Sequence, residues 1–318
     1  MGKSQLCLQL SIHVQLPQVF GGLEAGAIYI GTESSLATPR LNQIVSSLST
    51  ELINHPPPHI STSEIDSALD ALSTHGDRIL YFHCPDLESQ EHIISYQLPV
   101  VLSRHRIGVI ILDSVTANYR AEFDRPTASQ KSQSQPAQMA QRSKDLRKLA
   151  STLKDLAVEW NVAVVAVNQV TDTFKRGSSS PGTQGEEELL ALDYQAKWFD
   201  GLVEEGEGGM EGTKRPALGL VWTNLITSRI MLVKDNDGRT RIKVVFSPFA
   251  RSGSLVYEIG PAGIHAVETD RGKGIITDKK ELEVADINNL GSDFESRLDD
   301  MEFSDLDVEE LLSGQTNI

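Results

Sequence analysis

Short apolar runs alternate with segments of helical periodicity along the first half of the chain. Apolar residues repeat at helical spacing over 36–54 and 138–160, and Ser63 is a plausible N-cap for a helix between them. The expected strands are 27–31, 78–83, 109–112 and 162–167. The last three are nearly continuous in β-branched and apolar residues, which is typical of strands covered on both faces. This alternation predicts an α/β fold with a mostly parallel sheet between two helical layers.

The pattern changes after residue 216. Two turn sequences, at 235–238 and 260–263, each separate a pair of short β-rich runs. The expected strands are 229–234, 240–246, 255–259 and 264–267. The fold is therefore expected to end in antiparallel strands.

Three segments lack either pattern. Residues 130–138 are rich in Ser and Gln and are expected to form a loop. Residues 177–213 form an acidic insert, and we expect residues 269–318 to be an acidic, disordered tail after a core over 1–268. Apolar side chains between the carboxylates make the tail either a short interaction segment or a solubilising end.

Charge is unevenly distributed. The chain of 318 residues has a formal net charge of −15. Residues 177–213 hold nine acids and one base, residues 278–318 hold thirteen acids and three bases, and the remaining 240 residues hold 25 bases and 22 acids. The core is therefore slightly basic, so the acidic total does not exclude a nucleic-acid partner. The longest apolar runs are too short for a membrane span, and the two cysteines are expected to be buried thiols.

The chain begins with Gly2-Lys3-Ser4, followed by an apolar helix start. Gly-Lys-Ser/Thr is the second half of the phosphate-binding loop G-x-x-x-x-G-K-[ST], in which lysine reaches phosphates and the hydroxyl binds Mg²⁺. By itself the tripeptide also fits an ordinary N-terminus.

Polar residues follow three of the expected strands. Asp113 ends one strand and could bind Mg²⁺ or cap a helix, while Glu33 could activate a water or be an exposed loop acid. Asn168 and Gln169 end a third strand, where Gln169 could sense a phosphate and Asn168 could simply form a turn.

A basic stretch covers residues 104–154, which hold ten Lys or Arg and four acids. Arg120 and Arg125 fall in an expected loop after Asp113, where they could contact a phosphate backbone. The bases of the following helix fit a solvated face at least as well; they are Arg142, Lys144, Arg147 and Lys148.

Taken in order, these motifs resemble the eukaryotic RecA-type recombinases and their paralogues. The resemblance covers roughly residues 2–267 and rests on the segments 2–10, 29–33, 112–123, 164–170, 217–222 and 229–232. It implies a RecA-like P-loop ATPase core that binds ATP and Mg²⁺. The run 5–9, the sequence at 168–171 and the long acidic insert resemble the paralogue branch more closely than the recombinase itself.

The resemblance also assigns roles. Gly2 and Lys3 would bind phosphate, and Ser4 and Asp113 would bind Mg²⁺. Glu33 would be the catalytic carboxylate and Gln169 the γ-phosphate sensor. The implied DNA contacts are Arg120 and Arg125, together with Lys175 and Arg176 at the base of the insert.

Such paralogues act in the nucleus in double-strand break repair by homologous recombination. They work with other paralogues and the strand-exchange recombinase, on single-stranded or branched DNA, and help the recombinase filament to assemble. Two alternatives stay open, namely a DNA-dependent ATPase with its own strand-exchange activity and a non-hydrolysing adaptor. The family's strand and first glycine ahead of Gly2 are lacking, so we expect the intact protein to extend upstream of Met1 and this chain to hydrolyse little ATP.

Overall fold

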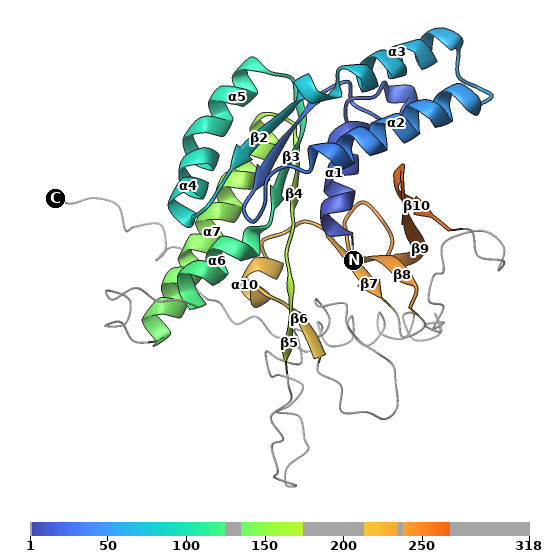
Figure 1. Ribbon diagram of the computed structural model, residues 1–318. Helices are drawn as coiled ribbons and strands as arrows, with labels where there is room; N and C mark the ends of the chain where they lie inside the picture. The colour runs from blue at the N-terminus through green and yellow to red at the C-terminus, as the bar shows by residue number, and fades with distance from the viewer. Residues whose placement is uncertain (1, 125–134, 174–212, 235–237, 268–318) are drawn as a thin grey trace, which may run out of the picture. The chain divides into compact units, whose positions relative to one another are not determined.

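The computed structural model describes residues 2–124, 135–173, 213–234 and 238–267. A four-stranded parallel sheet lies at its centre, in the order β2-β1-β3-β4 (Figure 1). The strands are β1 (Gly26–Gly31), β2 (Ile79–His83), β3 (Ile107–Asp113) and β4 (Ala163–Ala166). Gly31 pairs with both His83 and Asp113, so the carboxyl ends of three strands meet at one edge of the sheet.

Helices cover both faces of this sheet (Figure 1). On one face lie α1 (Lys3–His13), α2 (Thr38–Asn54) and α3 (Thr62–Ser73). On the other lie α4 (Leu87–His92), the π-helical turn η3 (Ile93–Gln97), α5 (Leu98–Arg104), α6 (Val115–Asp124), α7 (Gln135–Glu159) and α10 (Gly219–Thr223). Two short 3₁₀ helices, η1 (Gln18–Phe20) and η2 (His75–Arg78), complete the connections.

Alternation along the strands divides the core into two clusters. Ile110 and Leu112 of β3 pack with α5, α6 and α7, whereas Val109 and Ile111 pack with α1, α2 and α3. Successive side chains of a strand point to opposite faces, so Asp113 falls on the face of Ile111 and therefore beside α1.

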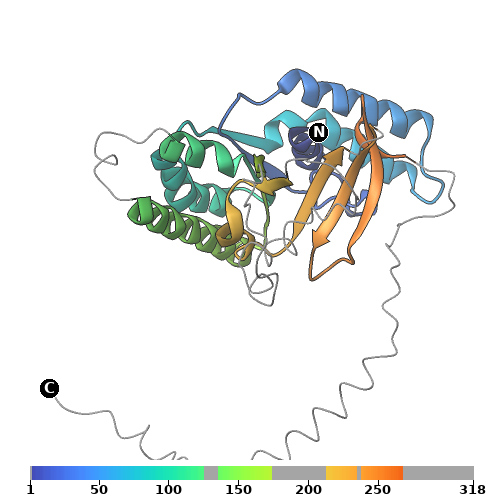
Figure 2. The same cartoon turned by 90° about the horizontal axis from the view of Figure 1, so that it is seen from below.

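A second sheet is antiparallel, in the order β10-β9-β8-β7, and lies near α1 (Figures 1 and 2). Its strands are β7 (Arg229–Lys234), β8 (Thr240–Phe246), β9 (Gly253–Gly260) and β10 (Gly263–Ala266). The Gln9 side chain holds α1 to β10, because it donates to the Ile264 carbonyl over 3.1 Å and accepts from the Ile264 amide over 2.7 Å.

A two-stranded ribbon joins β5 (Val170–Thr173) to β6 (Thr213–Pro216). Thr173 pairs with Thr213, so these two residues, far apart in the sequence, lie side by side. The first strand of the ribbon begins directly after Gln169. The sequence pattern did not predict this ribbon.

The structure confirms the parallel sheet, the two helical layers and the antiparallel strands, and it corrects three details. Arg120 lies on helix α6 rather than in a loop, because the chain turns into a helix two residues after β3 ends. Residues 135–138, expected in a loop, belong to α7. The N-cap of α3 is Ser61 instead of Ser63. The tail, most of the acidic insert, Arg125, Lys175 and Arg176 lie outside the described residues.

The chain divides into a unit over Met1–Ile276 and a second over Thr277–Ile318, and the described residues all belong to the first. Within the described part, no helix is long and apolar enough to cross a membrane.

The start of α3 carries a testable capping box. The Ser61 hydroxyl accepts from the Glu64 amide, and the Glu64 carboxylate accepts from the Ser61 amide over 2.8 Å. We expect Ser61→Ala to lower the free energy of unfolding by about 1 kcal/mol, because a helix amide loses its acceptor. Ser63→Ala, which leaves both capping bonds in place, should cost clearly less. Urea unfolding of the two variants measures the difference, and an equal loss would contradict the assignment.

Candidate functional site

The amino end of α1 forms one wall of the site. Gly2 caps this helix with a φ of 89°, a backbone conformation that favours glycine, and an added Cβ would lie 2.8 Å from the Ile259 side chain. Lys3 and Ser4 follow as its first residues. The first amides of a helix lack intrahelical partners, and the first turn of α1 holds no acid to offset its partial positive charge. This end of the helix therefore suits an anion.

Asp113 stands opposite, at the end of β3. Its Oδ2 accepts hydrogen bonds from the Ser4 hydroxyl and from the Tyr29 hydroxyl, both over 2.7 Å. Two donors from α1 and β1 therefore fix the carboxylate that the sequence predicted as a Mg²⁺ ligand.

Glu33 and Gln169 are also in contact. The Gln169 side-chain amide donates to Glu33 Oε1 over 2.8 Å, and its carbonyl accepts from Arg120 over 3.0 Å. A continuous chain of hydrogen bonds thus joins the predicted catalytic carboxylate, the predicted sensor and the predicted DNA contact.

Buried hydroxyls hold the strand ends in place. Thr32 accepts from the Ser114 amide over 2.8 Å and donates to the Ser114 carbonyl over 3.0 Å. Thr116 accepts from the Gln169 amide over 3.0 Å and donates to Asn168 Oδ1 over 2.6 Å. These bonds fix the backbone on either side of the site, so that Glu33 and Gln169 begin from defined positions.

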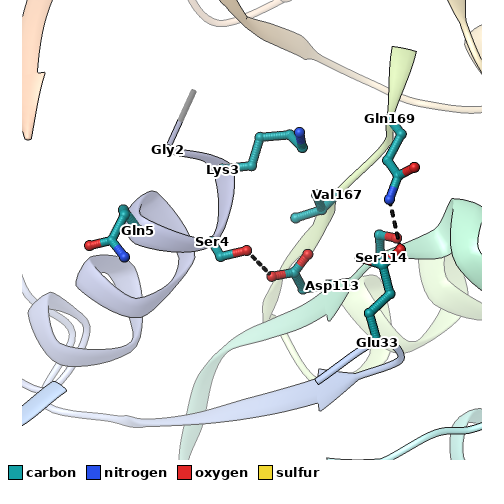
Figure 3. A pocket seen from close by; sticks show the side chains of 9 residues that line it. All are labelled: Gly2, Lys3, Ser4, Gln5, Glu33, Asp113, Ser114, Val167 and Gln169. Carbon is teal, nitrogen blue, oxygen red and sulfur yellow. Dashed lines mark hydrogen bonds between the residues drawn. The ribbon is translucent and has the colours of Figure 1, made fainter. Parts of the chain in front are cut away.

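The amino end of α1 and the side chains that follow the strands surround a cavity of about 290 Å³ (Figure 3). Lys3 is one of the lining residues, and among the described residues it has no hydrogen-bond or ion-pair partner. The Ser114 hydroxyl is buried and also has no partner in the described structure. The lining residues are Gly2, Lys3, Ser4, Gln5, Glu33, Asp113, Ser114, Val167 and Gln169.

Burial affects the groups beneath the cavity. Desolvation, followed by the Asp113 charge, raises the pKa of the Cys7 thiol to about 12. The same two causes, in the same order, raise the pKa of the Tyr29 phenol well above its usual value. Both groups stay protonated at neutral pH, so Tyr29 acts as a hydrogen-bond donor. The other cysteine, Cys84, is also buried, as the sequence predicted.

The described bases of the basic stretch have different surroundings. Arg120 is exposed on α6, next to the buried Tyr119. On α7, Arg142 donates to the Ala217 carbonyl over 3.3 Å, and Lys148 pairs with Glu91. Arg142 and Lys148 thus hold structural contacts, whereas Arg120 borders the cavity residues.

The structure adds residues that sequence reasoning missed. In the sequence, Tyr29 looks like one more apolar residue of a buried strand. Thr32 and Thr116 lie close to Glu33 and Asp113 and show no pattern that marks them as functional. The pairing of Tyr29 with Ile111 could have been guessed only from a known register. No group of three or more His, Cys, Asp or Glu side chains suited to a metal occurs among the described residues. The hydroxyl of Ser4 and the carboxylate of Asp113 are the paired oxygen groups at the cavity that could hold a cation.

The Rad51 family model matches residues 1–53 and 68–186, which include every residue that lines the cavity. The chain belongs to the Rad51 family. Membership confirms the predicted RecA-like core and the predicted relationship to the recombinases.

Curated relatives of this Rad51-family chain are recombinase paralogues. The DNA repair protein rhp57 of Schizosaccharomyces pombe is 40% identical over 83% of this chain and 70% of its own length. XRCC3 of Mus musculus is 28% identical over 84% of this chain and 66% of its own length. The human DNA repair protein RAD51 homolog 2 is 30% identical over 84% of this chain and 61% of its own length. The chain thus spans about two thirds of these relatives.

Proposed function

We propose that this Rad51-family chain is the ATP-binding core of a recombination mediator in the nucleus. In this role it would pair with other recombinase paralogues and help the strand-exchange recombinase to assemble on single-stranded or branched DNA during double-strand break repair. The observation that carries the proposal is the convergence of Lys3, Ser4, Asp113, Glu33 and Gln169 around one cavity.

The residues of the cavity fit a nucleotide phosphate and Mg²⁺. Lys3 and the uncompensated end of α1 supply positive charge for phosphate oxygens, and Lys3 has no competing partner among the described residues. The Ser4 hydroxyl and the Asp113 carboxylate are oxygen ligands of the kind that Mg²⁺ prefers. The buried Ser114 hydroxyl offers a further hydrogen bond to a ligand. Mg²⁺ bound there would neutralise phosphate charge.

The volume agrees with this assignment. Pockets for whole small ligands usually enclose roughly 300–1,000 Å³. A cavity of about 290 Å³ suits the phosphate end of a nucleotide, with the rest lying outside it.

Glu33 and Gln169 would link the nucleotide to DNA. Glu33 can orient a water or accept its proton, and Gln169 already contacts Glu33 on one side and Arg120 on the other. A phosphate near Gln169 would compete with Glu33 for the Gln169 amide, and a DNA phosphate would compete with the Gln169 carbonyl for Arg120. ATP would then act mainly as a switch of DNA and partner affinity.

The mediator role is favoured by the relatives, which are named as DNA repair proteins of the paralogue branch. Residues 177–213 follow strand β5 closely in the sequence and carry an excess of acids. This negative charge would also weaken the DNA binding that a strand-exchange enzyme needs. A non-hydrolysing adaptor is the second candidate, because Ser4 and Gln169 already donate to one oxygen each of Asp113 and Glu33 within the protein.

Nucleotide binding can be tested at Lys3. We expect Lys3→Ala to weaken binding of a fluorescent ATP analogue in Mg²⁺ at least about tenfold, because removing one charged hydrogen bond costs about 1.5–3 kcal/mol. Lys154→Ala, which removes an exposed charge on α7, is the control and should bind like the unmodified chain. Equal affinities for all three proteins would reject the nucleotide site and favour the adaptor.

DNA contact can be tested at Arg120. In a titration with fluorescent single-stranded DNA, Arg120→Ala should bind more weakly at low salt. The slope of log affinity against log salt should fall by about 0.7, the value for one lost phosphate contact on a single strand. Arg147→Ala, on the exposed face of α7, should change both quantities less. An unchanged slope for Arg120→Ala would show that Arg120 does not touch a phosphate.

Strand exchange separates a mediator from a recombinase. The purified chain should give little exchange between homologous DNA strands alone, and it should increase exchange by the cognate recombinase when added to it. Exchange by the chain alone at the level of the recombinase would overturn the mediator role.

A further inference from the structure

We propose that Tyr29 is a positioning residue for the metal end of this site, which it serves by holding the Asp113 carboxylate toward the cation. The inference rests on the proposed nucleotide function. It assigns a role to a side chain that lies within the strand-end motif 29–33 but to which that motif gives no role of its own.

The sheet register brings Tyr29 to Asp113. Tyr29 of β1 pairs with Ile111 of β3, so Asp113 lies two residues further along the neighbouring strand. Residues two apart share a face, which places both side chains under α1. Tyr29 is only 5% exposed, and its hydroxyl donates to Asp113 Oδ2 over 2.7 Å.

The two donors to Asp113 have separable roles. A hydroxyl has one proton and two lone pairs, so Ser4 can donate to Asp113 while a lone pair faces a cation. Tyr29 lies beneath, in the apolar core with Cys7, and offers the cation no open route. Both donate to Oδ2, and no described residue donates to Oδ1. The free oxygen is therefore left for the metal or its water.

The hydroxyl of Tyr29 does nothing else in the described structure. Its ring packs with Cys7 and Ile111, which a phenylalanine would do equally well. A buried hydroxyl costs free energy unless it is hydrogen-bonded, and here its acceptor is the carboxylate at the cavity.

Tyr81 provides a matched control. Its ring centroid lies 6.4 Å from that of Tyr29 on the adjacent strand, but its hydroxyl donates to the Ser34 carbonyl over 3.0 Å instead of to Asp113. Tyr29→Phe and Tyr81→Phe thus each remove one hydroxyl from the same aromatic pair, and only the first removes a bond to Asp113.

The experiment separates metal binding from nucleotide binding. A fluorescent ATP analogue is titrated with each protein in EDTA, and Mg²⁺ is then titrated into the mixture. Loss of an outer partner of a metal ligand typically costs 10–100-fold in metal affinity. We expect Tyr29→Phe to raise the half-saturating Mg²⁺ concentration about tenfold, with unchanged affinity in EDTA. Tyr81→Phe should match the unmodified chain in both measurements.

A double-mutant cycle guards against an indirect effect. In an Asp113→Asn background, Tyr29→Phe should produce little further change in the Mg²⁺ dependence, because the two residues act as a unit. An unchanged Mg²⁺ midpoint in Tyr29→Phe, an equal loss in EDTA, or full additivity with Asp113→Asn would each overturn the role of Tyr29. If the unmodified chain binds no nucleotide with Mg²⁺, the proposed function itself fails and the inference falls with it.

Discussion

The parallel register between β1 and β3 is the constraint on which the site depends. Gly31 pairs with Asp113, and the side chains of Tyr29 and Asp113 consequently share the face covered by α1. A slip of one residue would turn Asp113 to the other face, toward the layer of α5, α6 and α7, and away from Ser4. The buried residues on both faces of β3 oppose such a slip, so the apolar core specifies the polar site.

The second sheet holds helix α1, whose amino end forms one wall of the cavity, in place. Gln9 exchanges two hydrogen bonds with Ile264, and Arg40 joins the Gln5 side chain to the Gly260 carbonyl over 2.6 Å in each case. Lys3 therefore depends on residues near the far end of the described chain. Ile259 leaves no room for a side chain on Gly2, which links the same sheet to the conformation of the cap.

Periodicity and the polar residues at strand ends were enough to predict the parallel strands and most of the candidate site residues. The apolar runs located the four parallel strands, and polar residues after three of them marked Glu33, Asp113 and Gln169 as candidates. The sheet brings these strand ends to one edge. Helix α6 was missed because β-branched and polar residues follow Asp113 without a clear helical period. Ser61 was recoverable, since it and Glu64 have capping-box spacing. The bond from Tyr29 to Asp113 depends on register between distant segments, which no local pattern contains.

The Gln169 side chain already uses both its amide and its carbonyl in hydrogen bonds, and a ligand at either end must compete with them. Its carbonyl accepts from Arg120, and its amide donates to Glu33. Any acceptor that draws the amide away frees Glu33, and any phosphate that draws Arg120 away frees the carbonyl of Gln169. If both ligands bind, the effect of each on the affinity of the other must be equal, because equilibrium coupling is reciprocal. In that case a single amide between two charged groups would couple nucleotide and DNA without a large movement of the fold.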